Sequence, residues 1–209
     1  MPAPPPTDLV RLEGFHALKH ALRFGAEIVD VEGDADEAAR LASELAPDLR
    51  LPPMRPAAEL VALARRPDVD VAQALARPGP VIYLEHPRRL GNLGAAIRVA
   101  AAAGAAAVLT TADPWHPVAI RGAAGLQFAL PVAQIAALPP TGRPLIAVDP
   151  DGEETSAPRH AVLAFGSERH GLTTELKAQA NARLRIPMRP GVSSLNLATA
   201  VAAVLYGLS

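Results

Sequence analysis

The sequence predicts an α/β protein in two parts, a small N-terminal α/β unit followed by a larger domain built on a parallel sheet. In the second half of the chain, short apolar runs alternate with segments of helical periodicity, which is typical of a parallel sheet with helices on both faces. The run Arg77-Pro78-Gly79-Pro80 is the clearest structure-breaking cluster. We therefore place the domain boundary between residues 77 and 78.

The segment before this boundary predicts a Pro-rich tail at residues 1–6 and a small α/β domain at residues 7–77. Leu12, Phe15, Leu18 and Leu22 recur at helical spacing, and Gly25 follows as a helix stop. Asp34 is a candidate N-cap. The other expected elements are strands at residues 26–31 and 49–51 and helices at residues 35–45 and 56–64.

The segment after the boundary, residues 78–209, predicts the parallel sheet. The expected strands are residues 81–84, 107–110, 145–148, 162–165 and 184–186, and the expected helices are residues 94–103, 117–124, 174–180 and 195–208. Ligands in such sheets bind beyond the carboxyl ends of the strands. We therefore look for functional residues directly after these strands.

Composition excludes several classes of protein. The chain has no cysteine, so a disulfide framework and a thiolate zinc site are excluded, and we expect no metal. Residues 1–6 have neither the basic nor the apolar region of a signal peptide. The longest apolar stretch, residues 94–109, is interrupted by Arg98, so we expect a cytoplasmic protein without a membrane span. The net charge is only −1, so any nucleic-acid site must be a local basic patch.

The first segment with unusual polar residues is 91–98, GNLGAAIR, between a predicted strand and a predicted helix. Asn92 and Arg98 are six residues apart, which places Asn92 at the helix start and Arg98 about a turn and a half further along. An asparagine N-cap followed by a solvated arginine would explain the pair without any function. A ligand site beyond the strand is the alternative.

The second segment is 165–171, FGSERHG, which follows a predicted strand and precedes a helix. Gly166 allows close backbone approach to a ligand, and Glu168 sits at the carboxyl end of the strand. An ordinary strand-to-helix turn is the structural alternative.

The third segment combines residues 186–188, IPM, with residues 191–196, GVSSLN. Ser194 can be explained as the N-cap of the alanine-rich helix that follows. Asn196 is harder to explain in this way, because asparagine is a poor helix former and this one is expected inside the first turn.

These three segments, in this order, resemble the motifs of the SpoU/TrmH family of SPOUT-class RNA 2′-O-ribose methyltransferases. The first is similar to the family's asparagine–glycine–arginine motif, with its six-residue gap, and the second to its glycine–serine–glutamate motif. The third is similar to its isoleucine–proline–methionine and serine–leucine–asparagine motifs. The resemblance covers residues 81–208, and residues 12–77 resemble more loosely the small substrate-binding domain of many members.

The resemblance implies a fold, a cofactor and an assembly. The C-terminal part of the parallel α/β domain would be threaded into a trefoil knot, a rare arrangement that no local pattern predicts. S-adenosylmethionine would bind in the knot, held largely by backbone groups of Gly166, Ile186 and Leu195. The sequence lacks the glycine fingerprint of a Rossmann site, which agrees with this expectation. The family also implies a homodimer.

The activity implied by the resemblance is methyl transfer from S-adenosylmethionine to a ribose 2′-hydroxyl of ribosomal or transfer RNA. The residues that match the family's active-site positions are Asn92, Arg98, Glu168, Ser194 and Asn196. A guanidinium stays protonated in proteins, so we expect Arg98 to grip a phosphate and stabilise the nascent alkoxide rather than act as a base. Glu168 would hold either Arg98 or a motif asparagine in place.

RNA also needs basic side chains outside the reacting atoms. His16, Lys19, His20 and Arg23 recur at the spacing of one helical face, and we expect Lys19 and Arg23 to bind RNA. A solvated amphipathic helix is the alternative. Further expected RNA contacts around the active site are Arg88, Arg89 and Arg169, with Arg189 nearby. Aromatic residues make up only 3% of the chain, so base stacking cannot dominate recognition.

Two other functions stay open. One is a catalytically inactive RNA-binding relative, against which the intact Arg98, Glu168 and Asn196 argue. The other is a nucleotide-binding α/β enzyme of another class, for which no P-loop or dinucleotide fingerprint exists.

The last predicted helix supplies a separate argument for a homodimer. Apolar residues spread round most of its circumference, which predicts burial on more than one side. These residues are Leu195, Leu197, Val201, Val204, Leu205 and Leu208.

Overall fold

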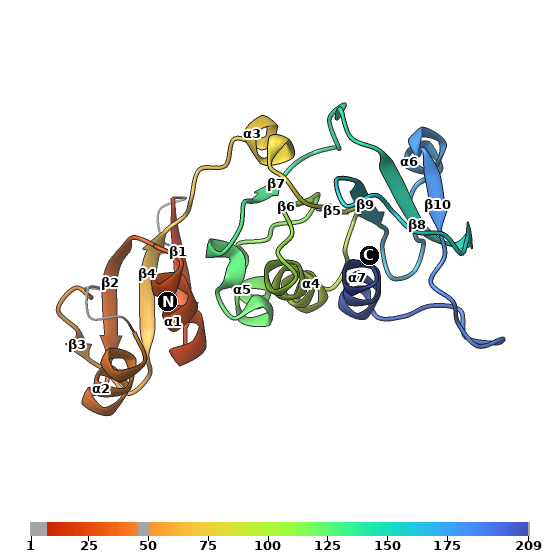
Figure 1. The fold of residues 1–209 in the computed structure, drawn as a ribbon. Helices are drawn as coiled ribbons and strands as arrows, with labels where there is room; N and C mark the ends of the chain where they lie inside the picture. The colour runs from red at the N-terminus through yellow and green to blue at the C-terminus, as the bar shows by residue number, and fades with distance from the viewer. Residues whose placement is uncertain (1–7, 46–50, 209) are drawn as a thin grey trace.

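The computed structural model describes residues 8–45 and 51–208, and it contains two α/β units joined by a linker (Figure 1). The N-terminal unit has a four-stranded mixed sheet in the order β1-β4-β2-β3, and the C-terminal unit has a six-stranded parallel sheet in the order β10-β8-β9-β5-β6-β7. The predicted fold class is confirmed. The knotted threading implied by the family resemblance stays a prediction.

The N-terminal unit packs two helices on one face of its sheet. Alternate residues of β1, Val10 and Leu12, are buried, and they share a core with Leu18, Leu22 and Leu41 of the helices. Asp34 caps the second helix by accepting the Glu37 N–H at 2.8 Å, as predicted. The elements are β1 (Leu9–Glu13), α1 (Phe15–Arg23), β2 (Ile28–Gly33), α2 (Ala35–Glu44), β3 (Arg55–Pro56) and β4 (Val61–Arg65).

Two sequence predictions in this unit are wrong. Leu12 belongs to a strand rather than to the helix that starts at Phe15, because its alternation with Val10 follows the strand period of two. The helix predicted from Pro56 to residue 64 is instead β3 and β4. Pairing of β4 with β1 on one side and β2 on the other overrides the helix propensity of its alanines. The strand expected at residues 49–51 falls mostly outside the described residues.

The C-terminal unit follows the sequence prediction closely. Three strands have the predicted bounds, β5 (Val81–Leu84), β6 (Ala107–Thr110) and β9 (Val162–Phe165), whereas β7 (Val132–Gln134) was not predicted. The remaining elements are α4 (Leu90–Ala102), α5 (Pro117–Ala123), the 3-10 turn η1 (Leu126–Phe128), β8 (Leu145–Glu153), α6 (Thr174–Gln179), β10 (Ala182–Leu184) and α7 (Leu197–Tyr206). The last strand begins two residues before its predicted start.

Helices cover both faces of the parallel sheet. On one face, α4 and α7 enclose a core that includes Ile82, Ile97, Leu163 and Val201. Gly94 and Gly122 let α4 and α5 approach closely. A Cβ on Gly94 would lie 2.1 Å from the Ala119 carbonyl oxygen, and one on Gly122 would lie 2.8 Å from the Gly91 carbonyl oxygen. The opposite face is covered by α6 and by the linker helix α3 (Val71–Ala76). No helix in the described part of the chain is long and apolar enough to cross a membrane.

Arg143 fixes the linker to the amino end of the sheet. Its guanidinium donates to the carbonyl oxygens of Leu75 at 2.5 Å, Gly79 at 2.6 Å and His160 at 3.1 Å, and also to that of Arg77. These bonds satisfy linker carbonyls that have no strand partner. The predicted breaker cluster is thus held rigidly against the sheet.

The two units share a continuous interface at α1. Ile120 and Trp115 of the C-terminal unit belong to the same apolar core as Phe15 and Leu18. A Cβ on Gly125 would lie 2.4 Å from the Ala17 carbonyl oxygen, so only glycine allows this approach of the two backbones. The N-terminal unit is therefore docked on α5 and η1.

Candidate active site

The three motif segments meet at the carboxyl ends of the parallel strands, in a chain of hydrogen bonds between side chains. Asn92, in the first turn of α4, donates from Nδ2 to Glu168 Oε1 at 2.8 Å. Asn196, just before α7, donates from Nδ2 to Asn92 Oδ1 at 3.1 Å. Residues more than one hundred positions apart in sequence are thereby held in one polar cluster, which we call the Asn92–Glu168–Asn196 chain.

Glu168 uses both of its oxygens to hold other groups. Its Oε2 accepts the Arg88 backbone N–H at 3.1 Å, at the entrance to α4. Burial by itself raises the pKa of this carboxyl, but the hydrogen bonds from Asn92 and from backbone N–H groups outweigh burial and lower the pKa. Glu168 is therefore an ionised acceptor, and of the two partners expected for it, the structure shows the asparagine.

Asn196, rather than Ser194, is the N-cap of the last helix. Its Oδ1 accepts the Ala198 N–H at 2.9 Å, and α7 begins at Leu197, two residues later than predicted. The expectation that Asn196 lies inside the first turn is therefore wrong, because its side chain satisfies a helix-end donor. One amide group both caps α7 and contacts Asn92. Ser194 is exposed in the preceding loop.

The loop after β9 depends on Gly166. Ser167 and Gly171 exchange backbone hydrogen bonds of 3.1 and 3.0 Å, which folds the loop tightly back on itself. A Cβ on Gly166 would lie 1.9 Å from the Gly171 carbonyl carbon, so no other residue fits here without a backbone shift. This tight loop projects Glu168 and Arg169 beyond the end of the sheet.

A cavity of about 410 Å³ lies beside the loop. Its walls come from the second half of β8, from the loops that follow β9 and β10, and from α6 and α7. Strands β8, β9 and β10 are neighbours in the sheet. All three residues expected to bind the cofactor, Gly166, Ile186 and Leu195, line it. Glu168 and Ser194 line it too, so the cavity adjoins the Asn92–Glu168–Asn196 chain.

Arg98 lies further along α4 and is exposed. In the described part of the chain its guanidinium makes no ion pair and no hydrogen bond. Arg88, Arg89, Arg169 and Arg189 are exposed in the same way, again without an ion pair among the described residues. By contrast, the sheet arginines of the N-terminal unit are paired, such as Arg65 with Asp8 at 2.7 Å.

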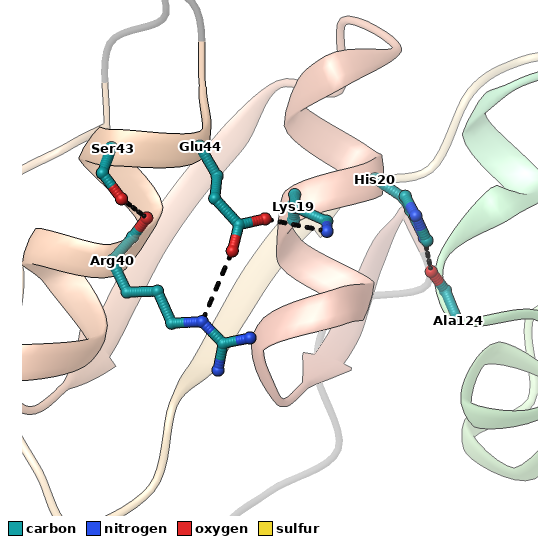
Figure 2. A network of polar contacts seen from close by, with 6 residues as sticks. All are labelled: Lys19, His20, Arg40, Ser43, Glu44 and Ala124. Atoms are coloured by element: carbon teal, nitrogen blue, oxygen red, sulfur yellow. Dashed lines mark hydrogen bonds and ion pairs between the residues drawn. The ribbon is translucent and has the colours of Figure 1, made fainter.

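The basic residues predicted on α1 do not act alike (Figure 2). Lys19 Nζ lies 3.0 Å from Glu44 Oε2 on α2, and only 15% of its side chain is exposed. His20 faces the other unit, where its Nδ1 donates to the Ala124 carbonyl oxygen at 2.7 Å. Only Arg23 and His16 of this set are exposed. RNA binding by Lys19 and Arg23 stays a prediction.

Sequence reasoning missed two pairs that shape this region. Buried Glu85 accepts hydrogen bonds from Thr173 N at 2.7 Å and Thr173 Oγ1 at 2.8 Å, which ties the end of β5 to the start of α6. Asp149 and Lys177 form an ion pair in the cavity wall. Each of these two acids directly follows a run of four apolar strand residues. An acidic residue in that position was the sign in the sequence that could have identified both pairs.

Comparison with known proteins identifies relatives of the whole motif region. The chain matches the SpoU rRNA Methylase family over residues 79–206, more than half of its length. It is 36% identical over 139 residues, 60% of this chain and 51% of the relative, to an uncharacterized tRNA/rRNA methyltransferase from Synechocystis sp.. It is 28% identical over 168 residues, 71% of this chain and 58% of the relative, to a 23S rRNA uridine 2′-O-methyltransferase from Streptomyces viridochromogenes.

Solved structures extend the likeness to the N-terminal unit. A crystal structure of an RNA 2′-O ribose methyltransferase is 27% identical with a TM-score of 0.73, covering 95% of this chain and 87% of that chain. The SpoU methyltransferase AviRb from Streptomyces viridochromogenes, solved with AdoMet, shares the fold with a TM-score of 0.77 at 23% identity, covering 95% and 88%. The chain spans about half the length of the curated relatives that it matches. On the match over residues 79–206, this chain belongs to the SpoU rRNA Methylase family.

Proposed function

We propose that this protein transfers a methyl group from S-adenosylmethionine to the 2′-hydroxyl of a ribose in ribosomal or transfer RNA. The observation that carries the proposal is the Asn92–Glu168–Asn196 chain beside a cavity at the carboxyl ends of parallel strands. Family membership supports it, as does the description of relatives as 2′-O-methyltransferases.

The cavity fits S-adenosylmethionine in size and in the character of its walls. Its volume of about 410 Å³ is in the range of small-molecule sites. Gly166 lets the two ends of the loop after β9 meet backbone to backbone, and it presents no side chain to the cavity that it lines. Ile186, Leu195 and Leu197 supply apolar surface for a purine. Gly166, Ile186 and Leu195 are the residues we propose to hold the cofactor.

Bound S-adenosylmethionine supplies an electrophilic methyl group whose departure leaves a neutral thioether. The 2′-oxygen would form its bond to the methyl carbon as the carbon–sulfur bond breaks. Asn92, Asn196 and Ser194 orient the ribose, and Arg98 stabilises the charge that develops on its oxygen. Glu168 is not the base, because both of its oxygens are engaged and its pKa is lowered. The hydroxyl proton leaves to solvent.

The exposed arginines around the site support RNA as the substrate. A guanidinium binds the oxygens of carboxylates and phosphates with two parallel hydrogen bonds, and RNA carries a phosphate at every nucleotide. Arg88 and Arg89 lie directly before α4, and the backbone N–H of Arg88 donates to Glu168. Arg169 lies in the loop after β9. We infer that these three side chains grip the phosphates that flank the target ribose.

A direct transfer assay tests the proposed function. The full chain is incubated with tritiated S-adenosylmethionine and total RNA from a strain that lacks it. We expect label to enter RNA with the wild-type protein and to drop by at least about tenfold with Asn92→Ala, which removes the link between Glu168 and Asn196. Cofactor binding without any transfer to RNA would instead favour the inactive RNA-binding relative.

Arg23 provides the test of RNA binding by the N-terminal unit. Arg23→Glu should weaken RNA affinity and reduce its salt dependence, because one phosphate contact is lost, while cofactor affinity stays unchanged. Lys19→Glu is the informative comparison, since it places a second carboxylate beside Glu44 and should lower the melting temperature. Unchanged RNA affinity and salt slope for Arg23→Glu would indicate a merely solvated helix.

The proposal extends to a homodimer in the cytoplasm, where these RNAs are found. Of the apolar residues that predicted a dimer, those inside α7, such as Val201 and Leu205, are buried within one protomer by α4 and the sheet, whereas Leu195 lies before α7 and is 38% exposed. The buried residues of α7 therefore do not require a partner, and the dimer rests on the family resemblance. Tyr206 remains 68% exposed on this helix. Light scattering should give twice the 21.7 kDa of one chain, and a lone protomer at micromolar concentration would contradict it.

A further inference from the structure

Asp149 and Lys177 form an ion pair in the wall of the cavity, and neither takes part in the Asn92–Glu168–Asn196 chain. Asp149 directly follows the apolar residues 145–148 of β8, and Lys177 comes from α6. Lys177 Nζ lies 2.7 Å from Asp149 Oδ2, and 2% of the Asp149 side chain is exposed against 26% of Lys177. Asp149 Oδ1 accepts the Asp151 N–H at 2.9 Å.

The environment of Asp149 favours its ionised form. Burial by itself raises the pKa of this carboxyl, but the ion pair with Lys177 and the hydrogen bond from the Asp151 backbone outweigh burial and lower the pKa. Arg183 on the neighbouring β10 acts in the same direction. A carboxylate that lies in a cavity wall is therefore kept charged and held in one orientation from two sides.

The carboxylate also has unused acceptor capacity. An ionised carboxylate offers about four lone-pair positions. Oδ1 accepts one hydrogen bond, from the Asp151 N–H, whereas buried Oδ2 contacts Lys177 as an ion pair and accepts no hydrogen bond among the described residues. A nearly buried carboxylate that faces a ligand cavity is stabilised when the ligand donates an additional N–H bond to it. It cannot itself donate, so it discriminates against ligands that present an acceptor at this point.

We propose that Asp149 is a specificity-determining residue of the cofactor cavity, whose carboxylate accepts a hydrogen bond from an N–H donor of the bound cofactor, and that Lys177 is its positioning residue. This inference rests on the proposed function. S-adenosylmethionine has two groups with the required chemistry, the amino group of adenine and the α-ammonium group. Both would satisfy an acceptor that is fixed in place.

Calorimetry on the full-length protein tests this inference with three ligands. S-adenosylmethionine and S-adenosylhomocysteine carry both N–H groups, whereas 5′-methylthioadenosine keeps the adenine and lacks the amino-acid part. Asp149→Asn preserves the shape and turns an amide N–H₂ toward the ligand or Lys177. We expect it to weaken binding of S-adenosylmethionine by about tenfold or more, as for hydrogen bonds to charged groups.

The control is Glu153→Gln, an exposed acid on the same strand that does not line the cavity. Its three affinities should equal those of the wild type. If Asp149→Asn weakens all three ligands by a similar factor, the donor is the adenine amino group. If 5′-methylthioadenosine alone is unaffected, the donor is the α-ammonium group. Affinities within about twofold of wild type for all three ligands would overturn the inference.

Lys177→Met keeps the test decisive should Asp149→Asn fail to fold. Without the ammonium group, burial of Asp149 is offset only by the Asp151 N–H bond and by Arg183, so the pKa of its carboxyl rises. Affinity for S-adenosylmethionine should then fall as the pH is lowered from 8 to 5.5, more steeply than in the wild type. A profile that matches the wild type would count against the positioning role. A wild-type protein that binds none of the ligands would overturn the proposed function itself.

Discussion

Arg98 is the residue on which the proposed chemistry depends most. It lies on α4 six positions after Asn92, it is exposed, and in the described part of the chain it has no ionic partner. It does not line the cavity proposed for the cofactor. Its guanidinium is thus available to RNA and to the developing alkoxide rather than to S-adenosylmethionine.

Arg98→Ala should therefore lower methyl transfer without loss of cofactor binding. Removing a preorganised charge at a developing oxyanion commonly costs about 3–4 kcal/mol, or roughly a hundredfold to a thousandfold in rate. Arg98→Lys should restore little, because an ammonium group cannot reproduce the planar fork. The measurements are single-turnover transfer, cofactor affinity and melting temperature on the same samples.

The matched control for Arg98 is Arg11→Ala, which removes an exposed arginine that is paired with Glu13 on the N-terminal sheet. It should leave the rate of transfer unchanged. Transfer by Arg98→Ala within a few-fold of wild type would exclude a catalytic role for this residue and would weaken the whole assignment by motif.

The glycine loop after β9 is the element that joins the cavity to the polar chain. Gly166→Ala would place a Cβ 1.9 Å from the Gly171 carbonyl carbon, a backbone atom that cannot move aside alone. We expect the loop to open, with loss of cofactor affinity and a decrease of about 1–3 kcal/mol in the free energy of unfolding.

Gly142→Ala is the control for this substitution, because a Cβ there meets nothing within 4 Å. It should leave both cofactor affinity and melting temperature close to those of wild type. Wild-type affinity in Gly166→Ala would mean that the loop after β9 is not part of the cofactor site.

Elements were predictable from the sequence where the local pattern and the tertiary position agree. Strands β5, β6 and β9 are buried on both faces, so their continuous apolar runs predict both type and bounds. Strand β4 was mistaken for a helix because its pairing on both sides is non-local and leaves no sign in its own residues. The three motif segments, which occur in the same order as in the family, identified Glu168 and Asn92 as candidate site residues.

The hydrogen-bond pattern of the site was less accessible to sequence reasoning. The sequence predicts Asn196 inside a helix, where asparagine is unfavourable. In the structure its side-chain amide instead caps α7 and contacts Asn92. The pairing of Lys19 with Glu44 and the contact of His20 with Ala124 depend on how α1 docks against two neighbours. Helical spacing alone places such residues on a face but does not identify what that face meets.

At the scale of the whole molecule, His20 makes the docking of the two units sensitive to acid. Partial burial lowers the pKa of His20 below 6.5. The bond to the Ala124 carbonyl raises this pKa, and nearby cations lower it further, but burial is the largest influence. The unfolded chain therefore binds this proton more readily, and stability is lost as the pH falls below about 6.5.

We expect His20→Gln, which can still donate to Ala124, to flatten the fall in the free energy of unfolding between pH 7.5 and 5. His160→Gln, an exposed histidine of the C-terminal unit, should keep the wild-type slope. Denaturant titrations at each pH measure the free energy of unfolding of the three proteins. Superimposable profiles for His20→Gln and wild type would show that His20 does not couple docking to pH.

We expect the methyl group on a ribose oxygen, and the chemical identity of the product shows whether it is there. RNA methylated by the purified protein with S-adenosylmethionine carrying a CD₃ group is digested to nucleosides and analysed by mass spectrometry. We expect a 2′-O-methylnucleoside whose heavy label stays with the ribose fragment and which is absent with Arg98→Ala. Label on a base, or no labelled nucleoside from a protein that binds the cofactor, would contradict it.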